Sequence, residues 1–392
     1  MIIGIIGSGA MGAGIAQVAT AAGHTVRLLD QTEAALARAQ QNIHANLHKL
    51  AEKGKLSAAA VEATLTRLQP TRDYLDFSDC GLVLEAIVED LDAKQQLFRQ
   101  IEGAVSSECV LASNTSSLSI TSLAAACQHP ERFIGLHFFN PAPLMQLVEV
   151  IPAVQTRPSL AHEMKQLMQA WGKVPVLAQD TPGFIVNRLA RPFYGEAIRM
   201  LEEGLADAAT IDWAMTELGG FRMGPFALMD FIGHDVNYRV TESVFTAFFY
   251  DPRYKPSFTQ KRLLEAGYLG RKSGRGFYNY QEGAPQPEPT RDLDLGRMVL
   301  HRILAMLINE AVDALAFQVA SRDDLELAMT KGVNYPKGLL AWADELGLPN
   351  VLATLDQLYD EYREDRYRAS ALLRRMVRAT QTFFSQEAVT NS

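Results

Sequence analysis

The chain begins with the stretch Ile2-Ile3-Gly4-Ile5-Ile6-Gly7-Ser8-Gly9-Ala10-Met11-Gly12, which decides the fold of its first half. Residues 2–6 are apolar and rich in branched side chains, and such a short run predicts a buried strand of a parallel sheet. Gly7 permits a tight turn, Gly9 lets the backbone approach a pyrophosphate, and Gly12 lets the following helix pack closely on the strand. The stretch therefore predicts the strand–turn–helix unit that binds dinucleotides.

An acidic residue ends the next predicted strand. Thr25–Leu29 runs into Asp30, and an acid about 20 residues beyond the glycine turn can accept the ribose hydroxyls of a dinucleotide and repel a 2′-phosphate. This favours NAD over NADP. The opposing interpretation, a signal peptide or membrane anchor at the N-terminus, lacks a basic start and an unbroken apolar run of about 18 residues. We expect the cofactor to contact Gly7, Gly9, Ala10, Met11, Gly12 and Asp30.

The composition is that of a soluble globular protein. At 392 residues the chain is long enough for two or three domains with a large core. A formal net charge of −8 offers no basic footprint for nucleic acid. No targeting or transmembrane segment is visible, so we expect a cytoplasmic protein without a membrane partner. The three cysteines lack the spacing of a metal site, and we expect no metal.

Three side chains with acid–base or hydrogen-bonding chemistry follow apolar, strand-like runs. They are Ser116 within Ser113–Ser117, His137 at the start of His137-Phe138-Phe139-Asn140-Pro141, and Glu149. A histidine carries protons near neutral pH only when a second group fixes its tautomer and offsets its charge. We expect Glu149 to do this for His137, and Ser116 to hydrogen-bond a substrate oxygen. Singly, each residue could be structural; together, beside a dinucleotide site, they indicate proton removal from an alcohol coupled to hydride transfer.

Strand-like and helix-like segments alternate through the first 180 residues. This alternation predicts an α/β domain of the Rossmann type with a doubly wound, mostly parallel sheet. Two predicted helices, over about 32–51 and 57–68, are an insertion into that pattern. They carry Lys49, Lys53 and Lys55. The lysines form either a solvated basic patch or a clamp for the phosphates of a large anionic substrate, and composition leaves both open.

The second half is helical and contains an internal repeat. Glu196-Ala197 recurs 114 positions later as Glu310-Ala311, and the same offset relates Arg188 to Arg302, Ala214-Met215 to Ala328-Met329, Gly224 to Gly338, Asp230 to Asp344 and Gly233 to Gly347. We therefore expect a Rossmann domain at 1–181, a first all-α helical domain at 182–280, a proline-rich linker at 281–294 and a second helical copy at 295–392. The second copy has His301 at the position of Asn187. We expect this second copy to serve packing.

Taken in order and at these spacings, the motifs make the chain resemble the L-3-hydroxyacyl-CoA dehydrogenases over essentially its full length. The residues that carry the resemblance are Gly7–Ala16, Glu85-Ala86 with Glu89, Ser113–Ser117, His137–Pro141 with Glu149, Pro182–Arg188 and Gly270–Tyr278. The resemblance implies the NAD-dependent, reversible oxidation of an L-3-hydroxyacyl-CoA to the 3-oxoacyl-CoA. It implies NAD as the cofactor and an acyl-CoA substrate as the binding partner.

The resemblance also assigns individual residues. It implies a catalytic pair of His137 and Glu149, with Ser116 and Asn187 contacting the substrate. Because Asn187 belongs to the helical part, we expect the site in the cleft between domains. Lys49 and Lys53 match family positions that contact CoA. Asp30, Glu89, Lys94 and Asn114 match family positions that contact the cofactor.

The acyl group and the assembly stay open. The tandem helical units are most similar to those of the 3-hydroxyadipyl-CoA dehydrogenases of bacterial phenylacetate breakdown, but the segment between the units is shorter here. The expected substrate is therefore either 3-hydroxybutyryl-CoA or 3-hydroxyadipyl-CoA, in fatty-acid or aromatic-acid catabolism. Arg191, Arg199 and Arg222 could meet a terminal carboxylate or simply lie at the surface. The assembly is either a homodimer or an intrachain pseudo-dimer of the helical domains.

Two other functions are compatible with these observations. One is another β-hydroxyacid dehydrogenase that acts on a small acid without CoA. The other is a non-catalytic protein that binds NAD as a sensor or structural component. Turnover of 3-hydroxybutyrate would favour the first, and a histidine variant that keeps the cellular role would favour the second.

Overall fold

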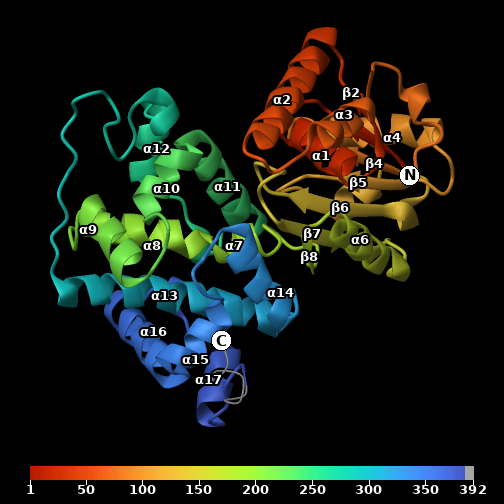
Figure 1. Cartoon of the computed structure of the whole chain (residues 1–392). Coiled ribbons are helices and arrows are strands. Elements are labelled where there is room, and N and C mark those ends of the chain that lie inside the picture. The colour runs from red at the N-terminus through yellow and green to blue at the C-terminus, as the bar shows by residue number, and fades with distance from the viewer. Residues whose placement is uncertain (385–392) are drawn as a thin grey trace. The chain divides into compact units, whose positions relative to one another are not determined.

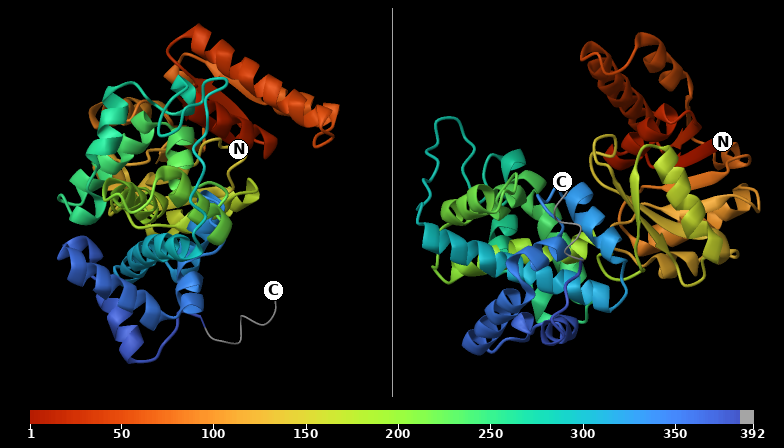
Figure 2. Two further views of the ribbon diagram at one scale, coloured as in Figure 1. Left: turned by 90° about the vertical axis from the view of Figure 1, so that its left-hand side faces the viewer. Right: turned by 60° about the horizontal axis from the view of Figure 1, so that its bottom comes forward.

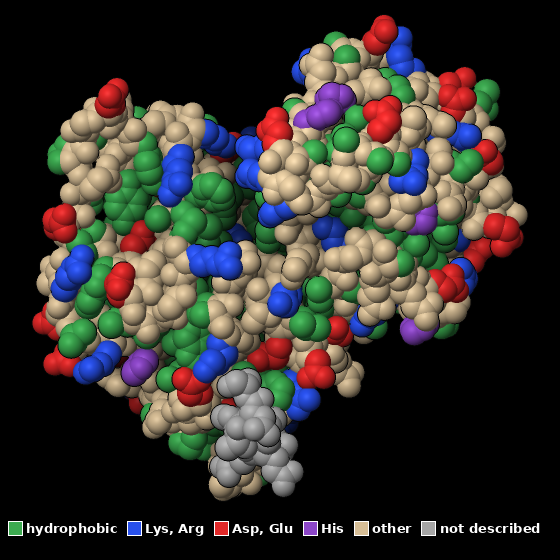
Figure 3. Space-filling model, in the orientation of Figure 1, with side chains coloured by type: hydrophobic (Ala, Val, Ile, Leu, Met, Phe, Trp, Pro, Cys, Tyr) green, Lys and Arg blue, Asp and Glu red, His purple; other side chains and the backbone are tan. Residues whose placement is uncertain are grey.

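The computed structural model describes residues 1–384. Contacts concentrate within two compact units, Met1–Phe184 and Ile185–Ser392 (Figure 1). Within the described part of the chain, no helix combines the length and the apolar character needed to cross a membrane. On the face shown in Figure 3, acidic and basic side chains are interspersed, so this face carries no extended field of one sign.

The first unit is built around one eight-stranded sheet with the order β3-β2-β1-β4-β5-β6-β7-β8. β7 is antiparallel to β6, and the other neighbours are parallel. This is the doubly wound, mostly parallel Rossmann sheet that the sequence predicts. Its strands are β1 (Ile2–Ile6), β2 (Thr25–Leu29), β3 (Leu68–Thr71), β4 (Leu82–Glu85), β5 (Val110–Ser113), β6 (Phe133–Phe138), β7 (Leu147–Pro152) and β8 (Val174–Leu177). Its helices are α1 (Ala10–Ala21), α2 (Glu33–Glu52), α3 (Ala58–Thr66), α4 (Leu91–Ala104), α5 (Ile120–Ala124) and α6 (Pro158–Ala170).

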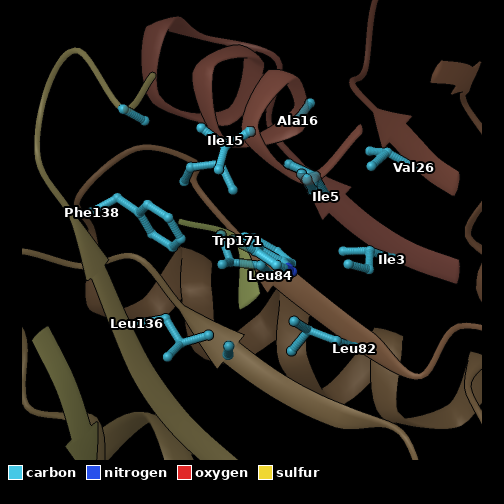
Figure 4. Close-up of a cluster of buried hydrophobic side chains, with 14 of the residues drawn as sticks. Ile3, Ile5, Ile15, Ala16, Val26, Leu82, Leu84, Leu136, Phe138 and Trp171 are labelled. Carbon is cyan, nitrogen blue, oxygen red and sulfur yellow. The ribbon is translucent and has the colours of Figure 1, made fainter. Parts of the chain in front are cut away.

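The core of this unit fixes β1 and α1 against the rest of the sheet. Ile3 and Ile5 of β1, Ile15 of α1 and Leu84 of β4 belong to one buried cluster with Trp171 (Figure 4). Burying one large apolar side chain stabilises a fold by about 1.5–3 kcal/mol. The turn between β1 and α1 is therefore anchored at both ends.

That turn depends on three glycines with different surroundings. Gly7 has a φ of +97°, and a Cβ on it would lie 2.5 Å from the carbonyl oxygen of Ala86. A Cβ on Gly12 would lie 1.8 Å from the carbonyl oxygen of Gly7. A Cβ on Gly9 would meet no atom within 4 Å. The fold itself requires Gly7 and Gly12, whereas the space over Gly9 is open.

One predicted helix is longer than the helix in the structure. The second inserted helix, expected to run to about residue 68, ends as α3 at Thr66, and Leu68–Thr71 forms the edge strand β3 beside β2. Pro70 is tolerated there because an edge strand leaves one side of its backbone unpaired. A four-residue strand that contains proline carries almost no periodic signal, so the sequence could not reveal it.

The second unit is all helical in its described part. Its long central helix, α13 (Leu293–Ala316), packs along α8 (Arg191–Glu202) (Figure 2). The side chain of Asp292 caps α13, and no helix or strand occupies residues 281–292. The other α-helices are α7 (Val186–Leu189), α9 (Ala208–Trp213), α10 (Pro225–Ile232), α11 (His234–Ala247), α12 (Phe258–Glu265), α14 (Arg322–Leu327), α15 (Leu339–Leu346), α16 (Leu348–Tyr362) and α17 (Ala371–Arg378).

Repeated residues of the second unit pair with one another reciprocally. Nε of Arg188 donates to Oε1 of Glu310 at 2.6 Å, and Nε of Arg302 donates to Oε1 of Glu196 at 2.6 Å. Each member of the first pair has its counterpart 114 positions away in the second pair. Reciprocal contacts of this kind are the pattern of an isologous, two-fold interface. Here both sides of that interface belong to one chain.

Candidate active site

His137 and Glu149 form a buried pair on neighbouring strands of the first unit. They are direct cross-strand partners in β6 and β7, and Nδ1 of His137 lies 2.6 Å from Oε2 of Glu149. His137 is 6% exposed and Glu149 is 0% exposed. Because β7 runs antiparallel to β6, a residue near the start of β7 lies beside one near the end of β6. The structure therefore brings the two residues into contact.

The pairing decides which ring nitrogen of His137 can exchange a proton. The carboxylate of Glu149 accepts from Nδ1–H, which orients the ring and stabilises its cation. Nε2 has no hydrogen-bond partner among residues 1–384. The rings of Phe139 and Phe184 lie 4.4 and 5.9 Å from the imidazole, centroid to centroid, and shield it from solvent. The arrangement can carry one proton to and from a bound molecule through Nε2.

Ser116 lies in a loop that is gathered around one carboxylate. Oε1 of Glu89 accepts from Oγ1 of Thr115 at 2.6 Å and from the backbone N–H groups of Ser116 at 2.9 Å and Ser117 at 3.1 Å. Burial would raise the pKa of Glu89, but the charge of Lys94 and these hydrogen bonds outweigh burial and hold the pKa below its usual range. Glu89 is therefore charged at neutral pH and anchors the loop.

A buried ion network lies next to this loop. Lys94 is 1% exposed, forms a salt bridge with Glu85 and has its Nζ 3.4 Å from Oε2 of Glu89. Glu85 is 0% exposed, and its Oε2 accepts from Oγ of Ser113 at 2.7 Å. Glu85 is not among the predicted site residues, although a carboxylate directly after the buried run Leu82–Leu84 is a signal for one. Lys94 faces carboxylates and does not line the cavity that contains the glycine turn.

Asn114 joins the ends of two strands. Its Oδ1 accepts from the backbone N–H of Phe138 at 2.8 Å, and its own backbone N–H donates to the carbonyl oxygen of Glu85 at 2.8 Å. Phe138 directly follows His137, so Asn114 holds the end of β6 beside the histidine. The amide thus ties the Ser116 loop to the strand that carries His137.

A cavity of about 670 Å³ opens beside the turn between β1 and α1. It lies at the carboxyl ends of parallel strands, where doubly wound sheets bind ligands. The first turn of α1 presents backbone N–H groups without intrahelical partners, which suit an anion such as a pyrophosphate. The open space over Gly9 gives that anion room. Of the predicted cofactor residues, Gly7, Gly9 and Asp30 line the cavity, and Ala10, Met11 and Gly12 form the first turn of α1.

The glycine turn also holds the carboxylate of Asp30. Oδ2 accepts from the backbone N–H of Ser8 at 2.8 Å and from its Oγ at 2.7 Å, and Oδ1 accepts from the backbone N–H of Gln31 at 2.8 Å. Burial would raise the pKa of Asp30, but hydrogen bonds from Ser8, Gln31 and Thr32 outweigh burial and lower the pKa. A fixed negative charge at the cavity fits the ribose hydroxyls of NAD and disfavours a 2′-phosphate.

The predicted CoA and substrate contacts lie on two further helices. Lys49 is in the last turn of α2 and Lys53 is its C-terminal cap residue, and both side chains are exposed. Two cations at a helix C-terminus are favourable in any case, because they meet the negative end of the helix dipole. Asn187 belongs to α7 in the second unit and is half-buried.

Two family models match the chain. The model described as "3-hydroxyacyl-CoA dehydrogenase, NAD binding domain" matches residues 2–181. The model described as "3-hydroxyacyl-CoA dehydrogenase, C-terminal domain" matches residues 183–280 and again residues 298–383.

Individual relatives agree with these models. The chain is 39% identical to the 3-hydroxyadipyl-CoA dehydrogenase of Escherichia coli K12, over 95% of this chain and 96% of the relative. The crystal structure of 3-hydroxybutyryl-CoA dehydrogenase from Escherichia coli K12 superposes with a TM-score of 0.92 at 38% identity and covers 97% of this chain and 98% of that one. For (S)-3-hydroxybutyryl-CoA dehydrogenase from Ralstonia eutropha the TM-score is 0.70 at 40% identity, over 72% of this chain and 99% of that one.

Proposed function

Since the chain belongs to the family of NAD-dependent 3-hydroxyacyl-CoA dehydrogenases, we propose that His137 is the acid–base group of its reaction, the reversible oxidation of an L-3-hydroxyacyl-CoA. The observation that carries this proposal is the contact of 2.6 Å between Nδ1 of His137 and Oε2 of Glu149, which leaves Nε2 for the substrate. An imidazole that is oriented through one ring nitrogen can exchange a proton through the other, which is what a general base requires.

In the direction of oxidation, Nε2 of His137 takes the proton of the C3 hydroxyl group. Bound NAD supplies the acceptor for the hydride that leaves C3. In the reverse direction, the imidazolium returns its proton to the oxygen at C3. Glu149 keeps the ring in one orientation and offsets the positive charge that the ring acquires. Holding the base in place in this way removes part of the entropic cost of the proton transfer.

Ser116 and Asn187 have the donors needed to position the substrate. We assign both to hydrogen bonds with the C3 oxygen or the thioester carbonyl. Glu89 sets where the hydroxyl of Ser116 lies, since its Oε1 accepts from the backbone N–H of Ser116 at 2.9 Å and from Oγ of Ser116 at 3.3 Å. Ser116 and Asn187 are the groups through which the protein would orient C3 toward the cofactor.

The cofactor and the CoA group have separate proposed contacts. The glycine turn and Asp30 would hold the adenosine half of NAD, with Glu89 and Asn114 as further predicted contacts, and the buried Lys94 would act through its salt bridge with Glu89. Lys49 and Lys53 would meet the phosphates of CoA. The relatives that carry the names 3-hydroxyadipyl-CoA and 3-hydroxybutyryl-CoA dehydrogenase support one of these two acyl groups as the substrate, in fatty-acid or aromatic-acid catabolism.

The assembly that we favour is an intrachain pseudo-dimer of the two helical copies. The reciprocal pairs Arg188–Glu310 and Arg302–Glu196 support it, because one chain already supplies both sides of the interface. Light scattering on the full chain should then give the mass of one chain, 43.3 kDa. The mass of a dimer would favour a homodimer instead.

The test of the proposed reaction is a histidine substitution. His137→Gln replaces the imidazole with an amide of similar size that cannot carry the proton. We expect the rate of NADH-linked reduction of acetoacetyl-CoA to fall by about 10²-fold or more. His162→Gln, on the exposed surface of α6, is the matched control and should keep the wild-type rate. Equal rates for the His137 variant and the wild type would overturn the proposal.

The same assay separates the two alternative functions. Efficient oxidation of free 3-hydroxybutyrate, with no gain from the CoA thioester, would identify a small-acid dehydrogenase. Binding of NAD without turnover of any 3-hydroxyacyl-CoA would identify a non-catalytic NAD-binding protein. Dependence on the thioester together with loss of activity in His137→Gln supports the reaction proposed above.

A further inference from the structure

The described part of the second unit contains four buried arginines, and one of them lacks the usual partner. Three form salt bridges with glutamate, whereas Arg191 has none with any carboxylate among residues 185–384. Its hydrogen bonds go to neutral groups only: Nε donates to the carbonyl oxygen of Asn187 at 2.9 Å, and Nη1 donates to Oγ1 of Thr241 at 3.0 Å and to the carbonyl oxygen of Asn237 at 3.5 Å. The three paired arginines are Arg188, Arg302 and Arg366.

The guanidinium of Arg191 is buried with part of its hydrogen-bonding capacity unused. Its Nη2 donates to no residue among 1–384. Its central carbon lies 4.9 Å from the ring centroid of Tyr194, a contact that stabilises the cation without neutralising it. Burial lowers the pKa of Arg191, yet a guanidinium stays protonated in proteins. An unpaired buried charge is costly, so this place favours an anion from outside the chain.

A second polar group belongs to the aromatic cluster around Arg191. Tyr335 is 5% exposed, and its hydroxyl has no hydrogen-bond partner in the described chain. The ring of Phe193 lies 5.8 Å from that of Tyr335 and 5.6 Å from that of Tyr194, centroid to centroid, and Tyr194 is the ring that Arg191 contacts. A buried hydroxyl without a partner costs about 1–3 kcal/mol. Its presence beside an unpaired cation suits one ligand that accepts from both groups.

The second helical copy shows that the fold does not need this cation. The counterparts of the arginine and its polar neighbours, 114 positions later, are apolar or different: Arg191 becomes Ala305, Asn187 becomes His301, Asn237 becomes Val351 and Thr241 becomes Leu355. A cavity of about 230 Å³ lined by His301, Ala305 and Val351, among others, occupies that place. The first copy has both Asn187 and Arg191, and the second copy has neither.

We propose that Arg191, assisted by the hydroxyl of Tyr335, binds the terminal carboxylate of a dicarboxylic 3-hydroxyacyl chain. The inference rests on the proposed function, in which Asn187 contacts the substrate. Nε of Arg191 donates to the carbonyl oxygen of Asn187 at 2.9 Å, so the guanidinium lies directly beside the residue that contacts the substrate. A guanidinium can bind that carboxylate through two parallel hydrogen bonds.

The other two arginines considered for this role have other surroundings. Arg199 already forms salt bridges with Glu203 at 3.1 Å and with Glu364. Arg222 is exposed. Tyr335 belongs to the second helical copy, so the proposal also gives that copy a function beyond packing.

A binding experiment tests the proposal without requiring turnover. Adipyl-CoA and hexanoyl-CoA have equally long acyl chains and differ only at the end, carboxylate against methyl. Calorimetry on the full chain should show that adipyl-CoA binds more tightly by about 10- to 100-fold. Arg191→Met should abolish that preference, and Arg199→Met, which removes a cation from the same helix, should retain it. Equal binding of the two thioesters by the wild type would overturn the proposal.

Kinetics separates this inference from the proposed function. With 3-hydroxyadipyl-CoA and 3-hydroxybutyryl-CoA as substrates, Arg191→Met should lower the ratio of their kcat/KM values by roughly 100-fold. Turnover of both substrates with an unchanged ratio would refute the carboxylate site and leave the dehydrogenase proposal intact. Absence of turnover for both by the wild type would refute the proposed function, while the binding preference would still report on the site.

Tyr335→Phe keeps the experiment decisive if Arg191→Met fails to fold. This change deletes one hydroxyl that has no partner, so the melting temperature should stay the same or rise. The preference for adipyl-CoA over hexanoyl-CoA should nevertheless fall by about 5- to 10-fold. A lower melting temperature with an unchanged preference would show that the tyrosine is structural and would contradict its part in the site.

Discussion

The hydroxyl of Ser8 donates to Oδ2 of Asp30 at 2.7 Å, so the turn after β1 holds the acid at the end of β2. The same oxygen accepts from the backbone N–H of Ser8 at 2.8 Å. Two neighbouring strands thus present one fixed carboxylate to the cavity, and the position of its charge does not depend on the cofactor. This relationship makes cofactor choice a property that single substitutions can test.

Asp30→Ala should weaken the binding of NAD more than the binding of NADP. The variant loses charge-assisted hydrogen bonds to the ribose, so Kd for NAD should rise by about 10- to 100-fold. It also loses the repulsion of a 2′-phosphate, so Kd for NADP should rise less or fall. Fluorescence titration with both reduced cofactors measures the change. Ser8→Ala, which loosens the carboxylate without removing it, should shift the preference in the same direction by a smaller factor; an unaltered preference in Asp30→Ala would remove the carboxylate from cofactor choice.

Glu149→Gln should lower kcat by about 10²-fold and leave the affinity for NAD unchanged, because the amide can no longer offset the charge of the imidazolium. Stopped-flow rates with acetoacetyl-CoA and equilibrium binding of NAD separate the two effects. Glu163→Gln, at an exposed pair with Arg157 on α6, is the control and should behave as the wild type. A drop in NAD affinity as large as the drop in kcat would show that the pair shapes the sheet and not the chemistry.

Gly9→Ala should weaken the binding of NAD, whereas Gly12→Ala should lower the stability of the fold. The Cβ added at Gly9 enters open space, so the variant should fold normally but bind NAD more weakly by about 10-fold or more, since backbone and pyrophosphate can no longer approach. The Cβ added at Gly12 would lie 1.8 Å from a backbone oxygen, so that variant should lose several kcal/mol, about 3 or more, of unfolding free energy. Urea denaturation and NAD titration of both variants provide the comparison. If both lost only stability, the space over Gly9 would not be a ligand site.

Lys173 should make the stability of the protein rise between about pH 8 and pH 10. The side chain is 9% exposed, and burial lowers its pKa to about 8. In the unfolded chain its pKa is about 10.4, so between the two values the unfolded state holds the proton that the folded state has released. Unfolding free energy attributable to Lys173 therefore increases with pH through this window, by about 1–3 kcal/mol.

The comparison that isolates this effect is the difference in unfolding free energy between the wild type and Lys173→Met. The unfolding free energy of the wild type should rise relative to that of Lys173→Met as the pH is raised from about 7.5 to about 10. Measuring a difference cancels the contributions of tyrosines and cysteines that titrate in the same range. A difference independent of pH would show that the ammonium keeps its proton, held by its hydrogen bonds to the carbonyl oxygens of Ala142 and Met145.

Arg302→Met should destabilise the second unit more than any surface substitution. It leaves Glu196, which is 1% exposed, without its closest cation, and breaking one side of a buried pair costs about 3–5 kcal/mol. The double variant with Glu196→Met should recover part of that loss, because the buried carboxylate is removed together with its cation, while Arg366 keeps Glu364 at 3.5 Å. Arg297→Met, from the exposed pair with Asp294, should change stability by less than about 1 kcal/mol. Equal effects at the buried and exposed pairs would mean that the reciprocal pairs do not hold the two copies together.

Local patterns were enough to predict the first 30 residues and the nature of the cofactor. The strand, the glycine turn and the acid at the next strand end lie within one continuous stretch, and their geometry follows from backbone sterics and strand periodicity alone. The repeat at an offset of 114 residues could be found in the same way, since it needs only a comparison of the chain with itself. The family followed from several such motifs occurring in order, and the fold class, the cofactor and the enzyme class predicted with it are confirmed.

Contacts between distant segments were decided only by the tertiary structure. His137 and Glu149 are 12 residues apart in sequence, but the register and the antiparallel direction of β7 decide that Nδ1 meets a carboxylate oxygen. Glu85 and Lys94 become a buried pair because helix α4 returns across the end of β4. No periodicity encodes which arginine in a helical unit lacks a carboxylate. Arg188, Arg191 and Arg302 are alike as residues in a sequence, and only packing, which removes each from water beside a different neighbour, makes two of them structural and leaves the third with an unpaired charge.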